Sequence, residues 1–275
     1  TDKGFSPSSL TNYIRNPLQF YMQRILRINE ADEVEENIAV NTLGTIIHNA
    51  LEELYTPYLN QYLALHHFET METKIDEVIL KHFKEIYKEG EITKGKNLLA
   101  FEVAKRNVYN FLQLEKKDIE EGQAIKVVLL EASLSCEIEV KSLPFPIKIA
   151  GKVDRIEERN GAIRIIDYKT GKVLGNSLKI NDFTDLTSDI KNEKIIQLLC
   201  YALMFENHEL KQNREVSAGI ISFKNMKSGF LPFGLGKGKD SELAISSEIL
   251  EDFKSELETL ILEIFNSEIA FKEKV

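Results

Sequence analysis

Two aspartates and a lysine in neighbouring strand-like segments have the residue types and spacing for phosphate chemistry. Asp167 and Lys169 lie two residues apart in RIIDYKTG (164–171), so a strand would present both side chains on one face. Asp154 lies in the preceding segment, and the Asn160-Gly161 pair between them is a strong hairpin signal. Counting outward from this turn pairs residue 157 with 164 and brings Asp154 close to Asp167.

Such a set suits a divalent cation that acts on a phosphodiester. Mg²⁺ is typically held by one or two carboxylates together with waters and phosphate oxygens, and a bound cation makes water a better nucleophile. Asp154 and Asp167 would hold the metal, and Lys169 would act on the water or on the developing charge. A cross-strand salt bridge, which contributes little at a surface, explains the same three residues equally well.

Two helix-like segments add polar residues at a spacing of four. Gly44 and His48 share one face in GTIIHNALEELY, and a glycine there leaves room for a close neighbour. Gln197 and Tyr201 share a face of the apolar segment QLLCYALMF. Taken singly, each pair is more often an ordinary packed or surface pair than a site.

The elements that must position these residues follow a clear order. Helical periodicity marks 6–26, 42–60, 71–90 and 97–122, with a break at Asn16-Pro17 in the first. Three strands at 125–140, 145–159 and 161–171 precede a helix at 192–210, a strand at 215–225, a loop at 228–240 and a final helix at 246–268. This predicts one α/β domain with a helical N-terminal layer: helical 1–124, a core at 125–225, and a loop and helix at 226–275.

Composition sets the broad class. The chain has 275 residues, 43% hydrophobic and 29% charged, which is typical of a soluble globular domain. No apolar run approaches the roughly 20 residues that span a bilayer, so we expect no membrane contact. Two scattered cysteines favour a reducing, cytoplasmic location. A net charge of -9 argues against coating nucleic acid with the whole surface but allows a local basic groove. Because the chain does not begin with methionine, we expect a fragment of a longer protein.

In this order, the motifs G-x-x-x-H, G-x-x-D-R-I, I-D-Y-K-T-G and Q-L-x-x-Y resemble the PD-(D/E)XK nuclease superfamily. The closest resemblance is to the RecB-like branch, and the segment 6–26 is similar to the opening of AddB-type nuclease domains. The resemblance implies a restriction-endonuclease-like αβββαβ core, with a mixed central sheet flanked by helices. The strand count above agrees with that order.

The resemblance also implies roles for individual residues. The metal ligands would be His48, Asp154, Asp167 and the backbone carbonyl of Tyr168. Lys169 would be the catalytic lysine, and Gln197 and Tyr201 would line the site. The cofactor would be Mg²⁺ or Mn²⁺, and the substrate would be DNA ends, single- or double-stranded.

One departure concerns the iron–sulfur cluster of many AddB-like relatives. The position of its first cysteine is occupied by Asn16, before Pro17, and no cysteine group follows near the C-terminus. The sequence therefore predicts no such cluster.

The sequence is consistent with three functions. The leading hypothesis is a metal-dependent exonuclease domain of a helicase-nuclease that processes DNA ends in recombinational repair, with a motor elsewhere in the protein or in a partner chain. A catalytically weak or inactive DNA-guiding module is the alternative. A structural interaction domain would bind no divalent metal at the strand ends.

Overall fold

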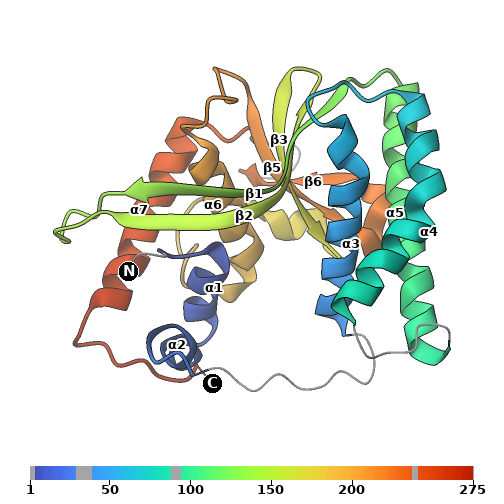
Figure 1. Ribbon diagram of the computed structural model, residues 1–275. Coiled ribbons are helices and arrows are strands. Elements are labelled where there is room, and N and C mark those ends of the chain that lie inside the picture. Colours follow the sequence, from blue (N-terminus) through green and yellow to red (C-terminus); the bar gives the residue numbers. More distant parts are fainter. Residues whose placement is uncertain (1–3, 29–38, 88–93, 237–240, 275) are drawn as a thin grey trace.

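A mixed five-stranded sheet lies at the centre of the computed structural model, which describes residues 4–28, 39–87, 94–236 and 241–274 (Figure 1). The strand order is β1-β2-β3-β5-β6. Their bounds are β1 Ile125–Ile138, β2 Ile147–Arg159, β3 Ala162–Lys169, β5 Val216–Ser222 and β6 Phe230–Pro232. The first three are consecutive and antiparallel, whereas β5 runs parallel to β3. The predicted mixed sheet with three antiparallel strands is confirmed.

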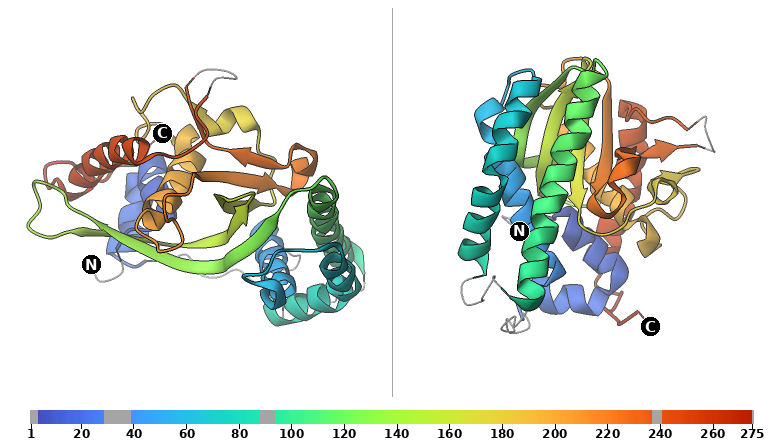
Figure 2. Two further views of the ribbon diagram at one scale, coloured as in Figure 1. Left: turned by 90° about the horizontal axis from the view of Figure 1, so that it is seen from above. Right: turned by 90° about the vertical axis from the view of Figure 1, so that its right-hand side faces the viewer.

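Helices cover both faces of this sheet, as predicted (Figures 1 and 2). On one face lie α3 (Val40–Tyr55), α4 (Leu65–Ile86) and α5 (Gly95–Glu120). Their apolar side chains form one core with Ile166 and Tyr168 of β3. On the other face lie α1 (Pro7–Arg15), α6 (Glu193–Phe205) and α7 (Ser247–Phe265). They share a second core with Ile163 and Ile165, so alternate residues of one strand enter different cores.

Several shorter elements complete the described chain. They are α2 (Pro17–Phe20), a π-helical turn (Tyr21–Ile25) and four 3₁₀ turns (Thr56–Tyr58, Gly175–Leu178, Ile190–Asn192, Phe223–Ser228). A separate small sheet pairs β4 (Lys179–Ile180) with β7 (Gly234–Leu235). The segment predicted as a loop at 228–240 thus contains two short strands, β6 and β7. Strands of two or three residues are too short to show an alternating pattern in the sequence.

Local turn chemistry explains where the decisive elements begin and end. Ser6 caps α1 reciprocally with Ser9, and Asn16 caps α2 immediately before Pro17, which confirms the predicted break. Between β2 and β3, Asn160 and Gly161 both have positive φ (52° and 88°), as a two-residue hairpin turn requires. This turn fixes the register that pairs Glu157 with Arg164.

Beyond the hairpin stem, β2 no longer pairs with β3, and Phe5 pairs with part of this edge instead. Its pairing with β3 extends from Arg159 only to Arg155, but its pairing with β1 continues to Ile147. Phe5 fills part of the free edge: its N–H donates to the Lys148 carbonyl, and its carbonyl accepts from the Ala150 N–H, both at 2.8 Å. An added Cβ at Gly4 would lie 2.4 Å from the Lys148 carbonyl oxygen, so only glycine fits beside this contact.

None of the helices in the described part of the chain is both long enough and apolar enough to cross a membrane.

Candidate metal centre and active site

The two aspartates meet where β2 and β3 begin to separate. The last paired residues of this register are Arg155 and Ile166, so Asp154 and Asp167 are the next across the strands. The backbone N–H of Tyr168 donates to Asp154 Oδ2 at 2.7 Å. This bond holds the Asp154 carboxylate against the end of β3, as the sequence predicts.

Lys169 lies against the carboxylate of Asp167. Its Nζ is 2.7 Å from Asp167 Oδ2 and 2.9 Å from Oδ1. The aspartate side chain is 2% exposed and the lysine side chain 31%. The acid is therefore buried, whereas the lysine that contacts it is partly open to solvent. Only the contact with Oδ1 is a hydrogen bond, so two of the three donors of the ammonium group remain for a substrate.

Helix α6 supplies the polar pair predicted from spacing. Gln197 Nε2 donates to Asp167 Oδ1 at 3.0 Å and to Tyr201 Oη at 2.7 Å. Gln197 is only half-buried, but Tyr201 is buried among core residues. The structure therefore brings Gln197 directly to Asp167 and links Tyr201 to the site through Gln197.

His48 reaches the same strand ends from helix α3. Its Nδ1 is 3.5 Å from Asp154 Oδ1, and its ring contacts Tyr168 edge-on at 5.6 Å between centroids. One turn earlier, Gly44 faces Thr170, and an added Cβ would lie 3.7 Å from that side chain. This is ordinary contact, so the fold itself does not require glycine at 44.

Glu131 is the residue of this cluster that sequence reasoning missed. Its Oε1 lies 3.6 Å from His48 Nδ1, and its Oε2 lies 2.7 Å from Lys152 Nζ. One ligand atom each of His48, Glu131 and Asp154 fall within 4.8 Å of one another. The only sequence signal is a single acid inside the apolar run VVLLEASL, which is too common to identify a site alone.

The electrostatics of the cluster favour a bound positive charge. Burial lowers the pKa of His48, but the carboxylates of Asp154 and Glu131 act more strongly and raise it to about 10. Burial raises the pKa of Asp167 to about 6, although the nearby Lys169 opposes the rise. The pKa of Glu131 is lowered, since contacts with His48 and Lys152 outweigh its burial.

These donors fit a divalent cation. Carboxylate oxygens are the preferred ligands of Mg²⁺ and Mn²⁺, and imidazole nitrogen is an acceptable ligand for the softer Mn²⁺. The carboxylates of Asp154 and Glu131 raise the pKa of His48, and a metal ion would answer the same negative charge with a larger positive charge. Of the side chains predicted from the sequence, His48, Asp154 and Asp167 are the ones that would hold it.

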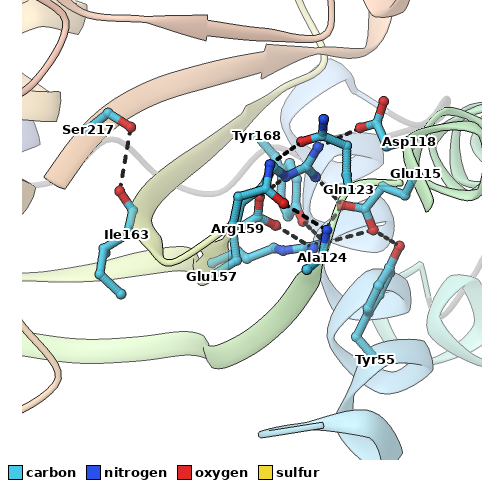
Figure 3. A network of polar contacts seen from close by, with 12 residues as sticks. Tyr55, Glu115, Asp118, Gln123, Ala124, Glu157, Arg159, Ile163, Tyr168 and Ser217 are labelled. Atoms are coloured by element: carbon cyan, nitrogen blue, oxygen red, sulfur yellow. Dashed lines mark hydrogen bonds and ion pairs between the residues drawn. The ribbon is translucent and has the colours of Figure 1, made fainter. Parts of the chain in front are cut away.

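On the opposite face of the same strand ends lies a buried network of paired charges (Figure 3). Arg155 is fully buried; its Nη2 lies 2.8 Å from Glu115 Oε1, and it also contacts Glu157. Arg159 Nε lies 2.9 Å from Glu157 Oε1. The Tyr168 side chain belongs to this face: its hydroxyl lies 3.4 Å from Arg155 Nη1, and burial raises its pKa. As neighbours in a strand, Arg155 and Asp154 point to opposite faces of the sheet.

A family model described as the PD-(D/E)XK nuclease superfamily matches residues 4–274. The chain belongs to the PD-(D/E)XK nuclease superfamily. The fold agrees with this assignment, since a five-stranded mixed sheet flanked by helices is consistent with the restriction-endonuclease-like fold. Nucleases of this superfamily use divalent metal ions, although the comparison does not specify which metal.

The similar proteins include two that are named only as uncharacterized proteins. One protein of Rickettsia conorii is 24% identical over 177 residues, which cover 61% of this chain and 19% of the relative. A protein of Rickettsia typhi is 25% identical over the same length, covering 61% and 18%. The matched region thus spans less than a fifth of these relatives. The crystal structure of SSO0001 aligns with 96% of this chain and 87% of its own, at 11% identity and a TM-score of 0.26.

Proposed function

We propose that this PD-(D/E)XK superfamily member is a metal-dependent deoxyribonuclease. The observation that carries the proposal is the meeting of Asp154, Asp167, Lys169 and His48 at one end of the sheet. A surface salt bridge, the competing explanation, would not require Asp167 to be buried to 2% exposure.

Each side chain has a proposed part in phosphodiester hydrolysis. Asp154, Asp167 and His48, together with the Tyr168 carbonyl, would hold Mg²⁺ or Mn²⁺, which neutralises phosphate charge and lowers the pKa of a bound water. Lys169 would donate to the scissile phosphate or the attacking water as negative charge develops. Gln197 would orient Asp167, and Tyr201 would hold Gln197 in place.

The finer assignment follows from the motif order. We propose membership of the RecB-like branch, with residues 1–275 forming one nuclease domain of a larger helicase-nuclease that degrades DNA from its ends during recombinational repair. The relatives' greater length leaves room for a motor in the same chain. We retain the prediction of a cytoplasmic location, since Cys136 and Cys200 are both free thiols. We also retain the prediction that no iron–sulfur cluster is bound.

The alternative is a DNA-guiding module that cuts slowly or not at all. The feature that favours it is the pair of contacts from Lys169 to both oxygens of Asp167, which keeps the lysine close to the acid. Nuclease assays with and without metal separate the two functions.

The test uses end-labelled linear DNA, single- and double-stranded, and a closed circle of single-stranded DNA, each with Mg²⁺, Mn²⁺ or EDTA. We expect metal-dependent loss of the linear substrates and survival of the circle, which would identify an exonuclease. Asp154→Asn and Lys169→Ala should reduce the rate roughly 10²–10³-fold. Lys172→Ala, an exposed lysine three residues after Lys169, is the matched control and should retain the wild-type rate.

Three results would contradict parts of this proposal. Cleavage of the circle would replace exonuclease with endonuclease. Metal and DNA binding without any cleavage would favour the guiding module. Cleavage that Asp154→Asn and Lys169→Ala leave intact would mean that the site lies elsewhere.

A further inference from the structure

Glu131 has a backbone conformation that is unusual for a strand residue. Its φ is +46°, in the left-handed region, which is strained for a residue other than glycine. The other described non-glycine residues with positive φ all lie in turns or loops, whereas Glu131 lies inside β1. Pairing with β2 is regular on both sides of it, from Leu130 with Arg155 to Ala132 with Val153.

The known partner of Glu131 does not account for this conformation. Lys152 contacts its Oε2 at 2.7 Å, but the lysine side chain is 57% exposed. An ion pair with such an exposed lysine contributes little to stability, so it does not offset the cost of a strained backbone. Residues held in strained conformations concentrate at ligand sites, where surrounding contacts fix them.

The other carboxylate oxygen points toward the candidate metal centre. Oε1 lies 3.6 Å from His48 Nδ1, and ligand atoms of Glu131, His48 and Asp154 all lie within 4.8 Å of one another. The Glu131 side chain is only 9% exposed. Its carboxylate therefore lies in a partly dry site, where a nearby cation would have a stronger effect than at the surface.

We propose that Glu131 is a further metal ligand, which binds one divalent cation together with His48 and Asp154. This inference rests on the proposed function, because it assumes that the chain binds a divalent metal. It adds a residue from β1 to a set drawn from α3, β2 and β3. A cation held this way would connect the helical layer to all three antiparallel strands.

Metal titration without nucleic acid tests this role independently of activity. Mn²⁺ is titrated by calorimetry into the wild type, Glu131→Gln and Glu137→Gln, and the metal-induced rise in melting temperature is measured for each. Glu137 is an exposed glutamate of the same strand and serves as the matched control. We expect Glu131→Gln to raise the dissociation constant at least tenfold and to reduce the rise in melting temperature, with Glu137→Gln unchanged.

A second variant keeps the test valid if Glu131→Gln folds poorly. Lys152→Met removes the competing ammonium group and leaves the Glu131 carboxylate in place. We expect Mn²⁺ to bind it a few-fold more tightly, since a neighbouring positive charge opposes cation binding.

The outcomes separate the inference from the proposed function. Equal Mn²⁺ affinity in the wild type and a folded Glu131→Gln would overturn the role of Glu131 and leave the nuclease proposal standing. Equal or weaker Mn²⁺ binding by Lys152→Met would also contradict it, because removing the competing lysine would then not help the metal. If the wild type binds neither Mn²⁺ nor Mg²⁺, both proposals fail.

Discussion

The two faces of the sheet bury charge in different ways at the same strand ends. On the face covered by α5, Arg155 and Arg159 are paired with Glu115 and Glu157, so every charge has a fixed counter-charge (Figure 3). The acids of the candidate metal centre are instead balanced by the partly exposed Lys169, the exposed Lys152 and His48, which reaches them from α3 on the same side of the sheet as α5.

This difference determines whether the charges can bind a group from outside the protein. Fixed internal pairs hold β2 and α5 together and need nothing from outside the protein. A histidine can lose its proton and an exposed lysine side chain can move away. The acids of the candidate metal centre can therefore accept a cation from solution. Because the faces alternate along β2 and β3, one residue step separates structural charge from site charge.

The largest effect should come from breaking the paired face. We expect Arg155→Leu to lower the free energy of unfolding by about 3–5 kcal/mol, because Glu115 and Glu157 would remain buried without their partner. Urea denaturation measures this change. Arg106→Leu removes an exposed arginine of α5 and should change stability by less than about 0.5 kcal/mol. A loss below about 1 kcal/mol in Arg155→Leu would show that solvent reaches the network.

A substitution in the candidate metal centre should instead increase the free energy of unfolding. The pKa of Asp167 is raised to about 6 from 3.8, so the stability that its protonated form provides is complete below pH 3.8 and is lost as pH rises through 6. In metal-free buffer at pH 8, Asp167→Asn should therefore raise the free energy of unfolding by on the order of 2 kcal/mol. The gain should shrink toward pH 4.

Thermal denaturation in EDTA at several pH values checks this prediction. Asp252→Asn changes an exposed acid of α7 and should show no comparable gain at pH 8. A destabilised Asp167→Asn at pH 8 would mean that the pair with Lys169 outweighs the burial of the carboxylate, and the contrast between the faces would weaken.

The smallest effect concerns the hydrogen bond that supports Asp167 indirectly. Tyr201→Phe removes the acceptor that Gln197 uses at 2.7 Å, so stability should fall by about 1 kcal/mol. Metal affinity should change less than twofold, because Gln197 would still contact Asp167. Unfolding and Mn²⁺ titration measure the two quantities, and Tyr109→Phe, on an exposed face of α5, is the control. A large loss of metal affinity would place Tyr201 closer to the metal than its contacts indicate.

Local sequence signals were sufficient to predict the hairpin and its acids. The Asn160-Gly161 turn determines the register, and the two-residue period of a strand then decides which side chains share a face with Asp167. Gln197 could be predicted to face the site from helical spacing and the family resemblance, but not its bond to Asp167, which depends on how α6 packs.

The position of Glu131 could not be predicted in the same way. β1 is joined to β2 by a longer connection, and their register shifts between Val127 and Leu129. A one-residue shift moves a side chain to the other face, so no count from a turn places Glu131 beside Asp154. Its left-handed backbone is likewise invisible in a sequence that has no glycine at that point.

The contact of Phe5 with β2 also bears on association between copies of the chain. From Ile147 toward Asp154, β2 has an edge that β3 does not cover, and an uncovered strand edge is a template for pairing with another molecule. Phe5 uses two of the hydrogen-bonding groups on this edge, at Lys148 and Ala150. By occupying these groups, Phe5 makes this part of the edge unavailable for pairing with a second molecule.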